Sequence, residues 1–99
     1  SFKGAFLLRA DLSENYINKC DFSKANLDEV DFSNTTLNNC NLKHATLIDA
    51  DLRGTVFREG TNLEGADLSD AKYDEETDFS GSNIIQEQLD SMIFVEDED

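Results

Sequence analysis

Residues 25–52 read ANLDEVDFSNTTLNNCNLKHATLIDADL, and a large apolar residue stands at every fifth position of this stretch. These central residues are Leu27, Phe32, Leu37, Leu42, Leu47 and Leu52. A step of five spreads side chains around a helix of about 3.6 residues per turn, and in a flat strand it alternates between the two faces. Neither a simple helix nor a flat strand therefore explains the pattern.

The same period extends in both directions and runs from Phe2 to Ile84, with two single-residue insertions. All 17 central positions hold Leu, Phe, Ile or Tyr. We expect the extra residues to bulge at corners near residues 58–60 and 74–76, because corners face solvent and tolerate insertion.

A second series of mostly small residues stands two positions before each centre, as at Ala25 and Ala45. Side chains two apart point the same way in an extended segment, so both series can face one interior. Four short sides then close a coil of 20 residues, and residues 20 apart stack at about 4.8 Å. The set Asn15, Thr35, Thr55 and Thr77 would line one wall, and each buried oxygen would need a partner or cost about 1–3 kcal/mol.

The motif Ala-(Asp/Asn)-Leu recurs at residues 10–12, 25–27, 50–52 and 66–68. With these motifs the chain resembles the pentapeptide-repeat proteins, a family abundant in cyanobacteria, over residues 2–84. The resemblance implies an all-β fold, a right-handed quadrilateral parallel β-helix of about four coils. It implies little about function, because one fold hosts many roles.

The period changes near the C-terminus. Apolar residues there fall on one helix face, at Ile85, Leu89, Met92 and Ile93. Asn83 followed by Gln86 resembles a capping box. We therefore divide the chain into a β-helix over 1–83, a short capping α-helix over 84–93 and an acidic tail over 94–99. A membrane-surface helix is disfavoured by the acidic flank.

The N-terminal coil has no matching cap in the sequence, which begins inside a repeat at Phe2. An uncovered coil presents unpaired strand groups and apolar side chains. Either a preceding segment covers it, or two molecules meet there in an end-to-end homodimer. Both alternatives stay open.

The net charge of -14 is unevenly placed. Residues 1–58 hold 8 acids and 7 bases, a net of -1, whereas residues 59–99 hold 14 acids and one base, Lys72, a net of -13. This asymmetry argues against DNA, RNA or an anionic membrane as a direct partner and favours basic proteins or metal ions. No leader is visible and the cytoplasm is favoured, although a segment removed before Ser1 would not be seen.

No catalytic, cofactor-binding or metal-binding set is predicted. His44 is the only histidine and stands at an outward corner position. Cys20 and Cys40 stack inward as small buried thiols, because the stack is too wide for a disulfide and offers no further metal ligand. We therefore expect no enzyme.

Two outward faces carry apolar residues that are candidates for a partner surface. One holds Phe6, Leu8 and Ile48, and the other holds Tyr16 and Val56. Exposed apolar groups mark partner sites in some proteins, but β-branched and aromatic residues also favour sheet surfaces.

Asp11, Asp31 and Asp51 should stack as an outward acidic ladder. Stacked carboxylates attract cations or a basic partner unless local groups moderate them. The alternative is that Asp and Asn simply recur before the central residue in this family.

Two functions are weighed. The first is a protein-interaction or scaffold module with an unknown protein partner. The second is a DNA mimic that binds DNA gyrase or topoisomerase, as the resemblance implies for quinolone-resistance members of the family. The near-neutral first 58 residues and a rod of only about 20 Å weaken the second.

Overall fold

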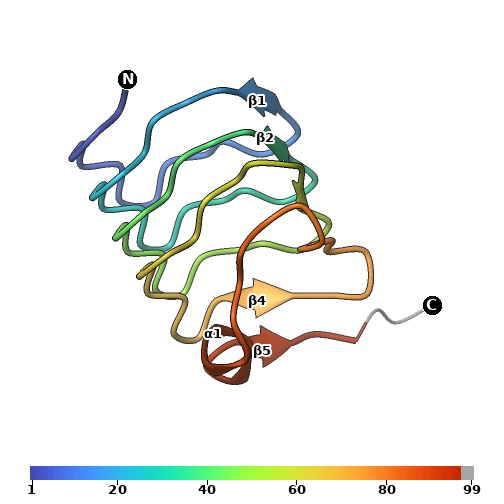
Figure 1. Cartoon of the computed structure of the whole chain (residues 1–99). Helices are drawn as coiled ribbons and strands as arrows, with labels where there is room; N and C mark the ends of the chain where they lie inside the picture. The colour runs from blue at the N-terminus through green and yellow to red at the C-terminus, as the bar shows by residue number, and fades with distance from the viewer. Residues whose placement is uncertain (97–99) are drawn as a thin grey trace.

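The computed structural model describes residues 1–96. The chain winds into a solenoid whose coils stack along one axis (Figure 1). The strands β1 (Tyr16–Asn18), β2 (Thr36–Asn38) and β3 (Val56–Phe57) lie above one another as a parallel sheet. Residues 20 apart are partners, as in Tyr16↔Thr36↔Val56, so the predicted stacking is confirmed.

Four ladders run along the solenoid, one for each step of five residues. Their first rungs are Phe6↔Asn26, Asp11↔Asp31, Tyr16↔Thr36 and Asp21↔Asn41. The spacing grows to 21 at Asn41↔Asn62 and to 22 at Val56↔Asp78. The two extra residues are therefore absorbed in turns, where Glu59–Gly60 and Glu75–Glu76 lie, as expected from the sequence.

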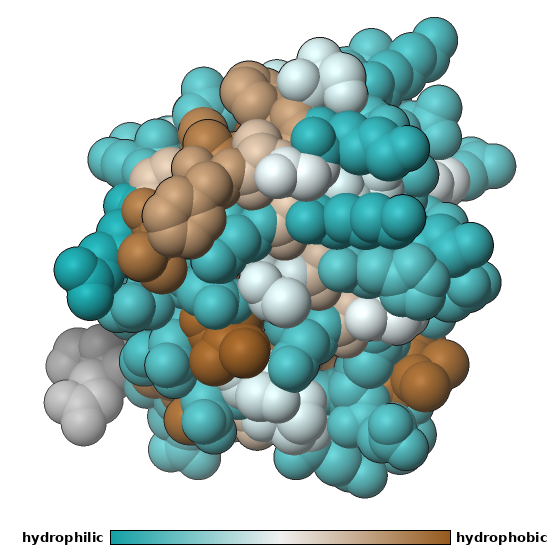
Figure 2. Space-filling model, turned by 90° about the vertical axis from the view of Figure 1, so that its left-hand side faces the viewer, coloured by the Kyte–Doolittle hydropathy of each residue, from teal (hydrophilic) through white to brown (hydrophobic). Residues whose placement is uncertain are grey.

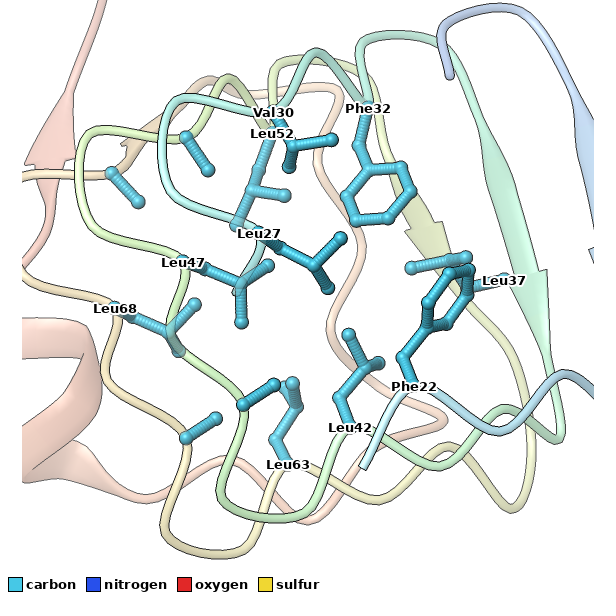
Figure 3. Packing of buried hydrophobic residues seen from close by; sticks show 14 of the residues in the cluster. Phe22, Leu27, Val30, Phe32, Leu37, Leu42, Leu47, Leu52, Leu63 and Leu68 are labelled. Carbon is cyan, nitrogen blue, oxygen red and sulfur yellow. The ribbon is translucent and has the colours of Figure 1, made fainter. Parts of the chain in front are cut away.

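The central residues fill the inside of the coils (Figure 3). Ten of the largest side chains are at most 1% exposed: Phe22, Leu27, Phe32, Leu37, Leu42, Leu47, Leu52, Phe57, Leu63 and Leu68. Leu7, Leu12, Ile17, Tyr73, Phe79 and Ile84 are partly buried against them. The predicted interior columns are therefore confirmed, with Phe2 in the first coil left 46% exposed.

The small inward positions hold hydroxyls that bond to the coil before them. Thr35 Oγ1 donates to Leu12 O over 2.7 Å, Thr55 Oγ1 to Phe32 O over 2.8 Å, and Thr77 Oγ1 to Leu52 O over 2.8 Å. Each hydroxyl that we expected on this wall has its partner. Asn15 is the exception to the predicted wall, because its side chain is exposed and donates to Ser13 O.

The corners are built from residues in the left-handed region of backbone conformation. Lys24 has φ 60° and Glu29 has φ 58°, each two residues after a centre. A backbone bond closes many of these turns, as from Ala25 N to Phe22 O over 3.0 Å. The left-handed residue turns the chain so that the next centre again points inward.

The C-terminal segment differs from the expected helix over 84–93. Helix α1 (Gln86–Asp90) has only five residues and is followed by strand β5 (Ile93–Phe94), which pairs in parallel with β4 (Lys72–Tyr73). The expected tail over 94–99 therefore starts inside a strand, and residues 97–99 lie outside the described part of the chain.

The start of α1 is also different from the predicted capping box at Asn83. The N-cap is Ile85, whose N–H donates to Gln88 Oε1 over 3.0 Å. Asn83 Oδ1 instead accepts from Leu63 N over 2.6 Å and so closes the solenoid wall. The predicted apolar face is only partly correct, because Met92 is buried and Leu89 half-buried, whereas Ile85 and Ile93 are exposed and the polar Gln88 is buried in their place.

Candidate interaction surfaces

The acidic ladder exists as a stack, because Asp11 pairs with Asp31 and Asp31 with Asp51. Its next rung is Lys72, which pairs with Asp51 and places a positive charge at the end of the three carboxylates. Cross-strand neighbours of opposite charge stabilise a ladder, whereas like charges directly opposite destabilise it. The stack is therefore partly neutralised by the chain itself.

Each ladder carboxylate is also held by the residue two positions later. Asp11 Oδ1 accepts from Ser13 N over 3.0 Å and from Ser13 Oγ over 2.6 Å. Asp51 accepts from both Arg53 Nε and Arg53 Nη2, over 3.0 Å and 2.8 Å. These carboxylates are engaged in local turns, which leaves fewer free lone pairs for a cation.

The protonation of the ladder follows from these contacts. Hydrogen bonds from Ser13 hold the pKa of Asp11 below its ordinary value. Burial acts to raise the pKa of Asp51, but the hydrogen bonds and charge of Arg53 outweigh it and lower that pKa. Within residues 1–96 no three acidic, histidine or cysteine side chains come together as a metal-ligand group.

The same turn recurs at the other positions where Asp or Asn precedes a centre, except at Asn83, whose Oδ1 accepts from Leu63 N instead. Further examples are the side chains of Asp21, Asn26, Asn41, Asn62, Asp67 and Asp78, each of which accepts from the N–H two residues later. Asp and Asn are the residues that form such turns with their own backbone. The geometry therefore favours the structural interpretation of Asp11, Asp31 and Asp51.

The candidate partner residues lie on two sides of the coil. Phe6 is 72% exposed and Tyr16 is 63% exposed, but they belong to ladders two steps apart, on opposite sides of the coil. Leu8 is exposed near Phe6, whereas Ile48 and Val56 are half-buried. The five residues therefore lie on two faces, as expected from the sequence, and on each face only the residues of the first coil are exposed.

Leu8 and Ile48 are also separated on their own side. Asp28, one coil after Leu8 and one coil before Ile48, bonds through Oδ1 to Ile48 N over 3.0 Å. In the view of Figure 2, a larger hydrophobic group lies at the upper left and smaller ones lie below it, with hydrophilic residues between them. The most exposed apolar residues of the N-terminal region remain Phe6 and Tyr16.

Three exposed apolar residues near the C-terminus were not predicted as a surface. Ile85 is 57%, Phe94 50% and Ile93 45% exposed. The sequence placed Ile85 and Ile93 on a buried helix face, and residue 94 in a solvated tail. The sequence spacing could have predicted a strand here, because Ile93 and Phe94 follow Lys72 and Tyr73 by one coil of 21 residues.

The two cysteines lie in a different environment from the histidine. Cys20 and Cys40 are free thiols, and burial raises the pKa of both. Cys40 Sγ donates to Ile17 O over 3.3 Å and so takes the place that threonine hydroxyls take in other coils. His44 stands exposed at a left-handed corner with φ 60°.

None of the helices in the described range 1–96 has the length and apolar character to cross a membrane.

Comparison with known sequences gives a family match. The family model for pentapeptide repeats matches with eight copies, over residues 1–28, 25–59 and 37–72. No protein with curated annotation matches the sequence significantly.

Solved structures that are similar to this chain are described as pentapeptide repeat proteins. A pentapeptide repeat protein from the cyanobacterium Cyanothece is similar with a TM-score of 0.50 and 26% identity, covering 76% of this chain and 54% of that one. One from the cyanobacterium Nostoc has a TM-score of 0.49 and 27% identity, with 95% and 84% covered. One from the thylakoid lumen of Arabidopsis thaliana has a TM-score of 0.48 and 31% identity, with 83% and 63% covered. The chain thus spans about half the length of the Cyanothece protein.

Proposed function

The chain belongs to the pentapeptide-repeat family, and on that premise we propose that it is a non-enzymatic protein-interaction or scaffold module. The observation that carries the proposal is the pair Phe6 and Tyr16, 72% and 63% exposed, on a frame with every buried side-chain polar atom of residues 1–96 hydrogen-bonded. Aromatic residues are enriched in protein interfaces and are costly to leave in water.

Regarding the frame itself, we propose a right-handed, quadrilateral coil. Parallel strands joined by crossovers are right-handed in nearly all proteins, and family membership supports the same hand. Residues 1–83 at 20 residues per rung give about four coils. Such a rod holds outward side chains at fixed spacing, which suits a module that presents or spaces other proteins.

The identity of the partner side can be tested with two charge-introducing variants. Phe6→Asp and Tyr16→Asp place a carboxylate on opposite sides of the coil without touching the interior. Wild type and both variants are used side by side for affinity capture from an extract of the source organism, with His44→Ser as a surface control. A partner that one variant loses and the other keeps identifies the binding side. Identical captures by all four proteins would contradict the proposal.

An end-to-end homodimer through the N-terminal coil is proposed as the accompanying assembly. Phe2 is 46% exposed and its ring stacks on Phe22 at 5.5 Å, so a second copy could cover its outer side. Light scattering should give a mass of two chains, which Phe2→Asp reduces to one. A single-chain mass for the wild type at high concentration would remove this assembly and leave the module function intact.

The alternative function, a DNA mimic acting on gyrase, has the acidic ladder in its favour. Against it, Asp51 is paired with Arg53 and the ladder continues into Lys72. We expect no inhibition in a gyrase supercoiling assay at micromolar protein. Inhibition that Asp31→Lys abolishes would replace the scaffold proposal with the mimic.

A further inference from the structure

Within residues 1–96, strand β5 pairs with β4 on one side and with no strand on the other. In β5 the N–H of Ile93 donates to Ala71 O over 2.8 Å, and the N–H of Val95 donates to Tyr73 O over 2.8 Å. Successive backbone groups in a strand point to opposite sides. The N–H of Phe94, between them, therefore points away from β4.

The equivalent position of every earlier coil on this ladder is occupied by the next coil. Leu12 N donates to Asp31 O, Phe32 N to Asp51 O and Leu52 N to Lys72 O, over 2.8, 2.9 and 2.8 Å. Phe94 is the next residue of this series, because it pairs with Tyr73, and Tyr73 itself lies one coil after Leu52. Within residues 1–96 the sheet ends at β5, so its outer edge matches one more parallel strand.

Apolar side chains accompany this edge. Phe94 is 50% and Ile93 45% exposed, and both lie in β5 itself. The Phe94 ring packs edge-on against Tyr73 at 5.3 Å, so one side of it is supported by the core while half of its surface remains in water. An added strand that carried apolar residues would cover this half.

The acidic residues around β5 determine which kind of strand can bind at its edge. The exposed acids Glu87 and Asp90 lie on α1, and Glu96 follows β5. Residues 59–99 carry 14 acids against Lys72 alone, a net of -13. Pairing this end with the same end of a second copy would bring two such charges together, which is unfavourable. A basic strand is attracted instead.

We propose that the edge of β5 is a docking site for an extended, basic segment of another protein. The segment lies parallel to β5, accepts from Phe94 N–H through a backbone carbonyl, covers Phe94 with an apolar side chain, and places Lys or Arg beside Glu87, Asp90 and Glu96. This rests on the proposed module function and names the chemistry of one partner. The surface is separate from Phe6 and Tyr16 in the first coil.

The test uses a fluorescent eight-residue peptide that alternates valine and lysine, titrated with the full chain by fluorescence anisotropy. A valine–glutamate peptide of the same length controls for charge, and the valine–lysine peptide with N-methylated backbone amides controls for strand pairing. We expect each control to bind at least 10-fold more weakly. Equal binding of all three peptides, or no binding of the valine–lysine peptide at millimolar protein, would overturn the proposal.

Variants locate the site. The double substitution Glu87→Lys with Asp90→Lys changes exposed side chains only and should weaken the valine–lysine peptide at least 10-fold, and Phe94→Ser should weaken it at least 5-fold. Phe6→Ser, a matched apolar-to-serine change in the first coil, should leave binding unchanged. An equal loss in Phe6→Ser, or no loss in the double variant, would contradict the assignment to β5.

Sedimentation of the protein without peptide tests whether a second copy of the chain, rather than a basic segment, occupies the edge of β5. If the edge is self-paired, Phe94→Ser dissolves an oligomer of the wild type, and a second copy replaces the basic partner as the occupant. If the peptide fails to bind while Phe6→Asp or Tyr16→Asp still loses a captured protein, the docking proposal fails and the module function stands.

Discussion

Threonine hydroxyls connect neighbouring coils along one wall. Thr35, Thr55 and Thr77 each donate to the carbonyl of a central residue one coil earlier. Their methyl groups pack in the interior beside the large central residues. Threonine therefore supplies an apolar methyl group to the core and a hydroxyl donor to the neighbouring coil. This explains why threonine recurs in a series of small inward residues in which alanine is the commonest.

The contribution of one such bond can be measured with Thr55→Val, which keeps the shape and removes the hydroxyl. Phe32 O also accepts from Thr35 N, so the carbonyl is not stranded. The free energy of unfolding should fall by about 1 kcal/mol in urea denaturation. The control is Thr36→Val on the outer side of β2, which should change it by less than ~0.5 kcal/mol. A loss of similar size in both would show that the hydroxyl bond contributes nothing.

The left-handed corners are a source of strain that can be relieved. Lys24 adopts φ 60° without an ion pair among those that the structure contains in residues 1–96. An L residue in this region is less favourable than glycine, and a β-branched residue is worse still. Lys24→Gly should raise the free energy of unfolding by about 0.5 kcal/mol, and Lys24→Val should lower it by at least ~1 kcal/mol. The same sign for both variants in urea denaturation would contradict this.

The period in the sequence predicts which side chains point inward, but it does not predict how far outward ones are covered. Leu27 and Leu47 are fully buried as expected. Among the outward residues, Ile48 is partly covered, because its backbone is tied to Asp28 one coil earlier, whereas Phe6 stays exposed in the first coil. Coverage depends on the neighbours one coil away, and these are set by packing rather than by the period.

Helix α1 is fastened to the solenoid by one glutamine. Gln88 Nε2 donates to Leu63 O over 2.8 Å and to Ala66 O over 3.1 Å, while its Oε1 accepts from Ile85 N. Leu63 O also accepts from Ala66 N over 3.0 Å, so the glutamine supplies a second donor to Leu63 O and the donor to Ala66 O. A buried side chain thus replaces the next rung on this side.

Replacing Gln88 by leucine should loosen the whole C-terminal segment. The variant keeps a similar volume but leaves Ala66 O without a donor, at a cost of about 1–3 kcal/mol, whereas Leu63 O keeps its bond from Ala66 N. Hydrogen exchange should show faster exchange of the Ile93 and Val95 amides, with the Thr36 and Val56 amides unchanged. Unchanged protection of Ile93 would mean that β5 is held by its pairing with β4 alone.

The first insertion depends on a close backbone approach at Gly81. A Cβ at this position would lie against the backbone of Phe57, Arg58 and Glu59. Gly81→Ala should therefore lower the free energy of unfolding by about 2–3 kcal/mol. Gly4→Ala, where a Cβ meets open space, is the control and should cost about 1 kcal/mol through its positive φ alone. Calorimetry or urea denaturation of both variants measures the difference.

The C-terminal elements show where sequence reasoning fails. The apolar spacing from Ile85 to Ile93 fits a helix face, but it also places Ile93 one coil after Lys72. Pairing with β4 prevails because it satisfies the backbone of β5 and packs Phe94 on Tyr73. A short window of four apolar residues cannot distinguish these two solutions, since the deciding contacts come from residues about 20 positions earlier.

Stability of the whole molecule should depend on pH through its turn carboxylates. Hydrogen bonds from Ser13, Ser23 and Ser80 lower the pKa of Asp11, Asp21 and Asp78 from the ordinary value of 3.8. A lowered pKa means that the folded state favours the ionised form, so this stabilisation is full above 3.8 and is lost as the pH falls through the lower folded values.

A triple variant isolates this effect from the change in net charge. Substituting asparagine at the three positions keeps an acceptor for each turn but removes the titration. From pH 5 to pH 2.5, the urea midpoint of the wild type should fall more than that of the triple variant. Parallel curves would show that acid destabilises the chain elsewhere.

The hydrogen bonds between coils, described above for each ladder, run along the axis of the rod. Tension on the two ends therefore loads the last coil alone, and the bonds open a turn at a time instead of shearing together. Each opened turn lengthens the chain by the contour of some 20 residues, about 65–70 Å. We therefore expect the chain to lengthen in steps of one coil under tension, rather than to unfold all at once.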